Sequence, residues 1–206
     1  MYNLLDKESD KSVITSVPQI SSSHNDYTDK VIKSDGNKIW FYDNIRDYSA
    51  LKLIQELKHI EINSLTHAIT FGTDPYPIYL HIHSPGGSVT SSFNVASTIE
   101  TLRVPVYTVV DGFAASGGTV ISMSGKKRFI RKTSYMLIHQ LSGWMGGTYE
   151  DMKDSMKNSD LMMKTIINFY KDKSNLSEKD LKKILKHDLY FDTETCLKYG
   201  LVDEIL

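Results

Sequence analysis

The sequence predicts an α/β fold built on a largely parallel sheet. From residue 38 onward, short apolar runs rich in β-branched residues alternate with longer segments of helical periodicity. This alternation is typical of parallel strands joined by helices. The chain has 206 residues, of which 40% are hydrophobic, so it is long enough to bury a substantial core in one domain.

The N-terminal segment differs in composition from the rest of the chain. Residues 1–37 are rich in Ser, Asp and Lys and contain few large apolar residues, so we expect them to be mobile. We assign residues 38–206 to the folded domain. Its expected elements are, in order, a strand at 39–42, a helix at about 49–60, a strand at 78–83, a helix at about 90–102, a strand at 106–110, a helix beginning at Ser116, a strand-like run at 135–140 and a long helix at 148–173.

Ser116 is the candidate nucleophile. It lies in the run Asp-Gly-Phe-Ala-Ala-Ser-Gly-Gly-Thr-Val, between an apolar strand and an apolar helix. At the start of a helix, unpaired backbone N–H groups favour an oxygen that gains negative charge during acyl transfer. Small residues at such a junction are also typical of tight helix–strand packing. The run alone therefore leaves both interpretations open.

Two further segments supply a candidate base and a candidate acid. His139 lies near the end of the strand-like run 135–140, where it can face a cleft, and Asp188 lies between a polar helical segment and an aromatic pair. Acyl transfer by a serine requires a nucleophile, a general base and a carboxylate that orients the base. Serine, histidine and aspartate are common in a chain of this size, so composition alone establishes no triad.

A Ser-Pro-Gly-Gly sequence at 84–87 follows the strand at 78–83 and precedes a helix. Adjacent glycines allow backbone N–H groups to approach a substrate closely. We therefore interpret the N–H groups of Gly87 and Gly117 as candidate donors to an oxyanion. An ordinary strand-to-helix turn would use the same residues.

Together these motifs resemble the Clp protease proteolytic subunits, which are serine peptidases that assemble into stacked rings. The resemblance covers about residues 38–206, and the motifs match in order and approximate spacing. The matching motifs are Ser-Pro-Gly-Gly at 84–87, Gly-x-Ala-Ala-Ser at 112–116, Met-x-Ile-His-Gln at 136–140 and Tyr-Gly-Leu-Val-Asp at 199–203.

The resemblance implies a fold, an activity and partners. The fold is a ClpP/crotonase-like spiral of ββα units with a protruding long helix, the handle. Ser116 is the nucleophile, His139 the base and Asp188 the third triad member, and the amides of Gly87 and Gly117 form the oxyanion hole. The activity is hydrolysis of peptides and unfolded polypeptides inside a chamber, without a cofactor. The partners are further copies, in heptameric rings stacked into a tetradecamer, and a ring-shaped ATPase unfoldase. The segment 1–37 is then an axial-pore loop or a removable propeptide.

The chain departs from the common pattern of that family at a few positions. Gly117 stands in place of a larger residue, His83 in place of an asparagine, and Leu141 in place of a proline. His187 replaces an arginine that, in the family, links ring-to-ring assembly to alignment of the triad. Coupling between assembly and activity is therefore open for this chain, which we expect to be a divergent member.

The helix expected at 148–173 carries an apolar seam, interrupted only by a serine. Such spacing is typical of a face that packs against a partner. The face can pack on the sheet of its own chain, whereas the resemblance makes it the handle through which two rings interdigitate. The seam residues recur at intervals of three and four: Tyr149, Met152, Met156, Ser159, Met163, Ile166 and Tyr170.

Charge and composition argue against several other classes. The formal net charge of −1 gives no reason to expect a nucleic acid or an anionic membrane as a partner. No export signal or segment of transmembrane length is evident, so we expect a cytoplasmic location. The chain lacks a phosphate-binding loop for ATP hydrolysis.

His81 and His83 share a strand face without an evident third ligand, so we expect no metal site. Cys196 is expected to be buried and inert.

Two other functions remain open. Crotonase-type acyl-CoA enzymes share the fold and use paired backbone amides as an oxyanion hole, but they do not need a Ser-His-Asp set. A non-catalytic ring subunit would keep the architecture with a poorly aligned site.

Overall fold

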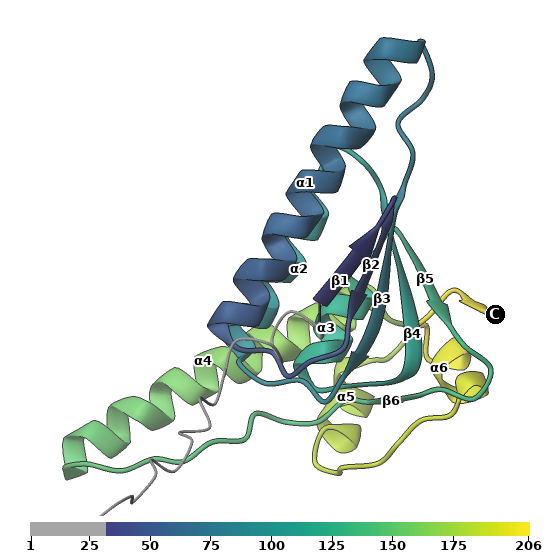
Figure 1. Ribbon diagram of the computed structural model, residues 1–206. Coiled ribbons are helices and arrows are strands. Elements are labelled where there is room, and N and C mark those ends of the chain that lie inside the picture. The colour runs from purple at the N-terminus through teal and green to yellow at the C-terminus, as the bar shows by residue number, and fades with distance from the viewer. Residues whose placement is uncertain (1–31) are drawn as a thin grey trace, which may run out of the picture.

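The structure is a computed structural model that describes residues 32–206 (Figure 1). Its centre is a seven-stranded sheet in the order β1-β2-β3-β4-β5-β7, with β6 paired to the end of β4. Among the strands of the described residues, β1–β2 is the one antiparallel pair, so the predicted α/β fold with a largely parallel sheet is confirmed. The strands are β1 (Ile32–Asp35), β2 (Lys38–Phe41), β3 (Ile78–Ser84), β4 (Val106–Ala115), β5 (Lys127–Ile130), β6 (Tyr135–Leu137) and β7 (Glu204–Ile205).

Helices α1 and α2 cover one face of the sheet (Figure 1). Alternate residues of a strand share a face, and Leu80 and Ile82 of β3 are fully buried together with Leu53 and Leu57 of α1. Burying each such side chain contributes about 1.5–3 kcal/mol. The helices are α1 (Asp47–Phe71), α2 (Val89–Thr101), α3 (Gly117–Met123), α4 (Tyr149–Lys173), α5 (Glu178–Ile184) and α6 (Thr193–Lys198).

The folded domain includes residues that the sequence assigns to the N-terminal segment. Residues 32–37 fall within the predicted mobile segment, but Ile32–Asp35 forms β1, which pairs with β2 through a turn at Gly36. The prediction is wrong for these residues because only Ile32 of the strand is buried, and its polar neighbours hide the apolar alternation. The rest of the predicted segment, residues 1–31, lies outside the described residues.

Helix α1 continues to Phe71, well beyond the predicted end near residue 60. Its last part carries exposed apolar side chains, among them Ile62 and Ile69, so the buried stripe is interrupted and the periodicity fades. The helix ends at Gly72, which adopts the left-handed conformation and donates its N–H to the Ala68 carbonyl. A glycine is favoured at this position because it accepts a positive φ without a Cβ penalty.

Strand β4 also runs further than predicted, to Ala115 instead of residue 110. The Asp-Gly pair at 111–112 suggests a turn, but Gly112 takes a φ of 81° inside the strand, and pairing resumes between Phe113–Ala115 and β6. The extension carries the chain to the carboxyl edge of the sheet, where Ser116 begins the connection to α3.

Helix α4 confirms the long helix predicted at 148–173 and extends away from the sheet (Figure 1). Its apolar seam divides in two. Ile166 and Tyr170, at 6% and 2% exposure, pack in the core, whereas Met152 and Met156 are 43% and 52% exposed. Packing on the sheet of the same chain therefore accounts only for the C-terminal part of the seam.

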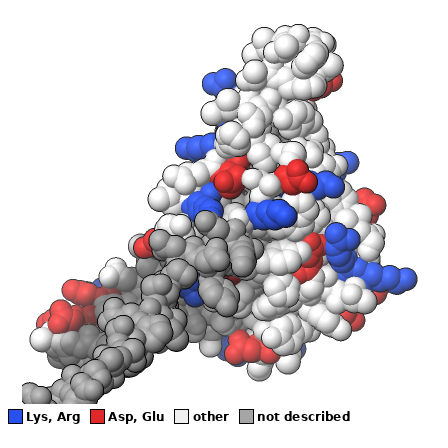
Figure 2. Space-filling view, viewed as in Figure 1, with Lys and Arg blue, Asp and Glu red and all other residues white. Residues whose placement is uncertain are grey.

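Charged side chains of both signs are interspersed over the described face in Figure 2, without a large patch of one sign. Among residues 32–206, no helix combines the length and the apolar character needed to cross a membrane.

Candidate active site

Ser116 occupies a sharp turn between β4 and α3. With φ 53° and ψ −122°, it is the only non-glycine residue in the described part of the chain with a positive φ. This conformation is unfavourable for an L-residue, and such residues cluster at functional sites. Hydrogen bonds hold it in place, because its N–H donates to the Leu137 carbonyl (2.8 Å) and its own carbonyl accepts from the Thr119 N–H (3.0 Å).

The turn at 84–87 lies directly against Ser116. A Cβ on Gly86 would lie 2.7 Å from the Ser116 Cβ and 2.6 Å from the Ala115 carbonyl oxygen, and φ at Gly86 is 94°. A Cβ on Gly87 would lie 2.1 Å from the Ile45 carbonyl oxygen. Both positions thus require glycine on steric grounds. The absence of a side chain at Gly86 allows the turn at 84–87 to approach the turn at Ser116 closely.

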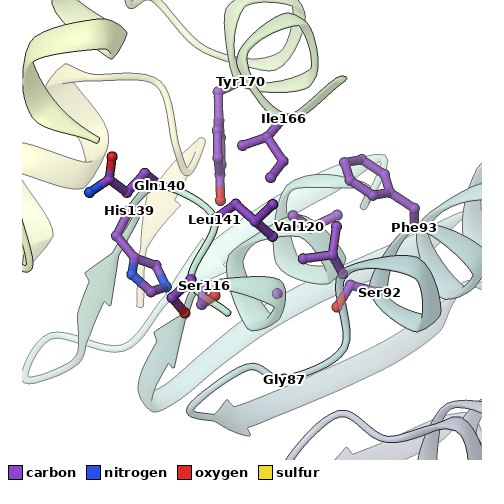
Figure 3. A pocket seen from close by; sticks show the side chains of 13 residues that line it. Gly87, Ser92, Phe93, Ser116, Val120, His139, Gln140, Leu141, Ile166 and Tyr170 are labelled. Atoms are coloured by element: carbon purple, nitrogen blue, oxygen red, sulfur yellow. The ribbon is translucent and has the colours of Figure 1, made fainter. Parts of the chain in front are cut away.

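A pocket brings four of the five predicted site residues together (Figure 3). Its polar edge is formed by Gly87, Ser116, Gly117 and His139, and the figure shows the imidazole ring beside the serine side chain. Much of the remaining wall is apolar and comes from α2, α3, the segment after β6 and α4. The apolar lining residues are Val89, Phe93, Val120, Leu141 and Ile166.

Asp188 joins the site through His139. Its Oδ1 lies 3.1 Å from Nδ1 of His139, with the histidine side chain 22% exposed and the aspartate side chain 78% exposed. Backbone hydrogen bonds from the Gln140 N–H to the Leu185 carbonyl (2.7 Å) and between Met136 and Phe191 hold the segment that carries Asp188 against the histidine segment. A carboxylate on Nδ1 leaves Nε2 available for a serine hydroxyl.

The backbone N–H groups of Gly87 and Gly117 border the same pocket. Neither group donates a hydrogen bond to an acceptor within residues 32–206. The Gly117 N–H belongs to the first turn of α3, where helical N–H groups have no intrahelical partner. Two unpaired donors beside a serine are the arrangement that stabilises a tetrahedral oxyanion.

The glycine at position 117 has a local steric cause. A Cβ on Gly117 would lie 2.2 Å from Oγ of Ser92, which is completely buried on α2 and donates to the Ser88 carbonyl (2.7 Å). The space that a larger residue would need at position 117 is therefore filled by Ser92.

Sequence reasoning missed the hydrogen bonds that support the Ser116 turn. Thr119 Oγ1 donates to the Ser116 carbonyl at 2.5 Å, and the Tyr170 hydroxyl lies 2.6 Å from the same Oγ1. Tyr170 stands out in the sequence only as a seam residue of the long helix. The two residues of this second contact are 51 positions apart, so no local pattern connects them.

Both strand histidines contact Asp111, a connection that sequence reasoning did not make. His81 Nδ1 lies 2.8 Å from Oδ2 of Asp111, and the same oxygen accepts from the Tyr42 hydroxyl (2.8 Å), whereas Oδ1 of Asp111 pairs with Arg131. Burial raises the pKa of Asp111, but the hydrogen bonds from His81, Tyr42 and Arg131 outweigh it and lower the pKa. His81 is thus a buried partner of the Asp111 carboxylate, and Nδ1 of His83 lies 2.8 Å from the Asp111 main-chain carbonyl oxygen.

Two further features of the sequence lie outside the pocket. Cys196 is buried as predicted, and burial raises the pKa of its thiol to about 12, so the thiolate is scarce at neutral pH. A group of basic residues at 126–132 lies partly in strand β5. Within it, Arg128 pairs with Asp203 and donates to the Lys173 and Gly200 carbonyls.

Comparison with known proteins places this geometry in context. The family model for Clp protease matches residues 21–206. The ATP-dependent Clp protease proteolytic subunit of Streptococcus mutans is 39% identical over 134 residues, covering 63% of this chain and 68% of the relative. The subunit of the same name from Leuconostoc citreum is 33% identical over 168 residues, covering 79% and 78%. Among solved structures, a ClpP1 mutant from Listeria monocytogenes has a similar fold, with a TM-score of 0.73, 23% identity and coverage of 84% of this chain and 92% of that one.

Proposed function

Because the chain belongs to the Clp protease family, as a proteolytic subunit with peptidase activity, we propose that it hydrolyses peptide bonds by serine catalysis at the pocket around Ser116. The observation that carries this proposal is the meeting in one pocket of Ser116, His139 and two backbone N–H groups that have no acceptor within residues 32–206. The contact between His139 and Asp188 adds the third member of a triad.

The proposed reaction proceeds through an acyl-enzyme. His139 accepts the Ser116 hydroxyl proton as Oγ attacks the peptide carbonyl, and the Gly87 and Gly117 N–H groups donate to the oxyanion. The imidazolium then gives its proton to the leaving amine as the C–N bond breaks. A water molecule, deprotonated by His139, then attacks the acyl-enzyme, and the imidazolium returns this proton to Ser116 Oγ as the ester C–O bond breaks and the acid product leaves. Asp188 holds the imidazole and stabilises its charged form throughout.

The triad assignment is tested by labelling with a fluorophosphonate probe and by Asp188→Asn. The probe should phosphonylate Ser116 with loss of fluoride, and peptide mapping by mass spectrometry identifies the site. Asp188→Asn should slow labelling and hydrolysis by about a thousandfold or more, because an amide in place of the carboxylate favours the wrong imidazole tautomer and no longer stabilises the imidazolium. Asp74→Asn, in an exposed loop, is the matched control and should leave both rates unchanged. Labelling of another serine would overturn the assignment, and absence of labelling would favour a non-catalytic ring subunit.

We further propose that the subunit forms heptameric rings stacked into a tetradecamer, which works with a ring-shaped ATPase unfoldase. The names of the relatives, proteolytic subunits of an ATP-dependent protease, support the ATPase partner. The exposed N-terminal part of the α4 seam supports a contact between rings. The acyl-CoA enzyme interpretation gains no support from the family match.

An enclosed chamber predicts a strong dependence on substrate folding. The purified protein should cleave a short fluorogenic peptide slowly without nucleotide and should leave a stably folded protein intact until an unfoldase and ATP are added. The same substrate, permanently unfolded by chemical modification, serves as the control and should be degraded without ATP. Degradation is followed by gel electrophoresis. Rapid degradation of the folded substrate by the protein alone would contradict the chamber.

A further inference from the structure

The side chains of Thr119 and Tyr170 form a hydrogen-bonded relay that ends on the main-chain carbonyl of Ser116. The Ser116 oxygen accepts from the Thr119 N–H (3.0 Å) and from Thr119 Oγ1 (2.5 Å), and the Tyr170 hydroxyl lies 2.6 Å from that Oγ1. Thr119 is completely buried and Tyr170 is 2% exposed. Figure 3 shows Tyr170 at the pocket, descending from α4.

The direction of the relay follows from counting protons. A carbonyl oxygen can only accept, so the one hydroxyl proton of Thr119 is used for the Ser116 oxygen. The Tyr170 hydroxyl must then donate to Thr119 Oγ1. Burial raises the pKa of Tyr170 to about 12, so the phenol keeps its proton at neutral pH and remains a donor.

The relay acts on the peptide unit that carries one of the proposed oxyanion donors. The Ser116 carbonyl and the Gly117 N–H belong to the same planar trans peptide, so they point in opposite directions and rotate together. Fixing the oxygen therefore fixes the direction of the N–H. The backbone of α3 contributes only the Thr119 N–H to this restraint, and Ser116 itself has a positive φ at the junction of β4 and α3, so the side-chain hydrogen bond adds a second donor to the same oxygen.

We propose that Thr119 and Tyr170 are positioning residues for catalysis, which hold the Ser116–Gly117 peptide so that the Gly117 N–H meets the oxyanion. Successive hydrogen bonds also polarise one another. Because the Ser116 carbonyl accepts two hydrogen bonds, the Gly117 N–H of the same amide becomes a stronger donor. The inference rests on the proposed function, since it assigns supporting residues to that oxyanion hole. The Tyr170 hydroxyl thereby connects α4 to the turn that carries Ser116.

The test compares four variants: Thr119→Val, Thr119→Ser, Tyr170→Phe and the double variant Thr119→Val/Tyr170→Phe. Valine keeps the branched shape of threonine without the hydroxyl, and serine keeps the hydroxyl. Each variant is measured for kcat and KM with a fluorogenic peptide and for inhibition by a peptide boronic acid. The boronic acid forms a tetrahedral adduct with Ser116 whose oxygen occupies the oxyanion hole, so its affinity reports on that site directly.

Thr119→Val should lower kcat about tenfold, less than the hundredfold or more typical for complete loss of an oxyanion donor. KM should stay within about twofold, because the interaction is made in the transition state. Boronic acid affinity should fall by a similar factor to kcat. Thr119→Ser should restore both values, and Tyr170→Phe should lower kcat by a smaller factor.

The double variant separates positioning from stability. Thr119→Val alone leaves the Tyr170 hydroxyl buried without a partner, which is destabilising, whereas removing both hydroxyls avoids that cost. The double variant should therefore melt at a higher temperature than Thr119→Val and show the same kcat, since Tyr170 acts through Thr119. It also provides the measurement if Thr119→Val does not fold.

Two outcomes would overturn the proposal for Thr119 and Tyr170. One is a folded double variant with the wild-type kcat, and the other is an equal loss of activity in Thr119→Ser and Thr119→Val. Failure of the proposed function looks different, because the wild-type protein itself would then lack hydrolysis that depends on Ser116.

Discussion

Replacing Ser116 by alanine should abolish peptide hydrolysis while the protein remains folded and assembled. Removal of the nucleophile from a serine protease lowers kcat by about six orders of magnitude, because the remaining groups have no covalent intermediate to stabilise. The substitution removes one oxygen at the pocket wall and leaves the backbone hydrogen bonds of the turn in place. Hydrolysis of a fluorogenic peptide, fluorophosphonate labelling and sedimentation velocity measure activity, reactivity and assembly on the same preparation.

The matched control is Ser97→Ala, on the exposed side of α2. It should leave all three measurements unchanged, so that an effect of Ser116→Ala is assigned to the position and not to the loss of any serine. Wild-type hydrolysis by Ser116→Ala would show that Ser116 is not the nucleophile. Loss of hydrolysis together with loss of assembly would indicate a structural role for the turn.

The surroundings of Ser116 could be predicted because their signals are local. An apolar β-branched run, a turn of small residues and an apolar helix are contiguous in the sequence, and the Ser-Pro-Gly-Gly turn has the same form. Parallel strands end at one edge of the sheet, so turns that follow neighbouring strands meet there. The structure confirms this convergence, since Gly86 lies within contact distance of Ser116.

The local sequence makes Asp188 a candidate acid, but its assignment to the triad came through the resemblance, because nothing near it in the sequence indicates which histidine it faces. The same limit applies to Asp111, whose contact with His81 spans 30 residues, and to the contact between Thr119 and Tyr170. Such side-chain contacts depend on how distant elements pack. A hydrophobic pattern predicts which face of an element is buried, but it carries no information about which polar groups meet across the interface.

The sequence pattern also did not predict that only part of the α4 seam is buried in the core of the same chain. The spacing is uniform from Tyr149 to Tyr170, yet only the C-terminal part reaches the core. The N-terminal part extends beyond the sheet, so among residues 32–206 its apolar residues meet nothing that would bury them as deeply as Ile166 is buried. A seam that is continuous in sequence and half-buried in the monomer is what a helix shared between a core and an interface requires.

Met156→Glu should therefore convert stacked double rings into single rings without unfolding the subunit. In a separate subunit the Met156 side chain is 52% exposed, so a carboxylate there remains hydrated and the fold is preserved. In a contact between rings the same carboxylate would be desolvated against apolar groups, at a cost of several kcal/mol unless it protonates or finds a partner. Since the contact repeats around the ring, the cost repeats at each subunit. Sedimentation velocity measures the assembly, and circular dichroism measures the helical content.

Ile166→Glu, on the same face of α4, is the control for the core. Ile166 is 6% exposed, so this change should lower the melting temperature strongly or prevent soluble expression, whatever the assembly state. The contrast between the two variants distinguishes interface from core on a single helix. If Met156→Glu stays double-ringed with unchanged helical content, this part of the seam is not the contact between rings. If it unfolds like Ile166→Glu, the N-terminal half of α4 packs in the core after all.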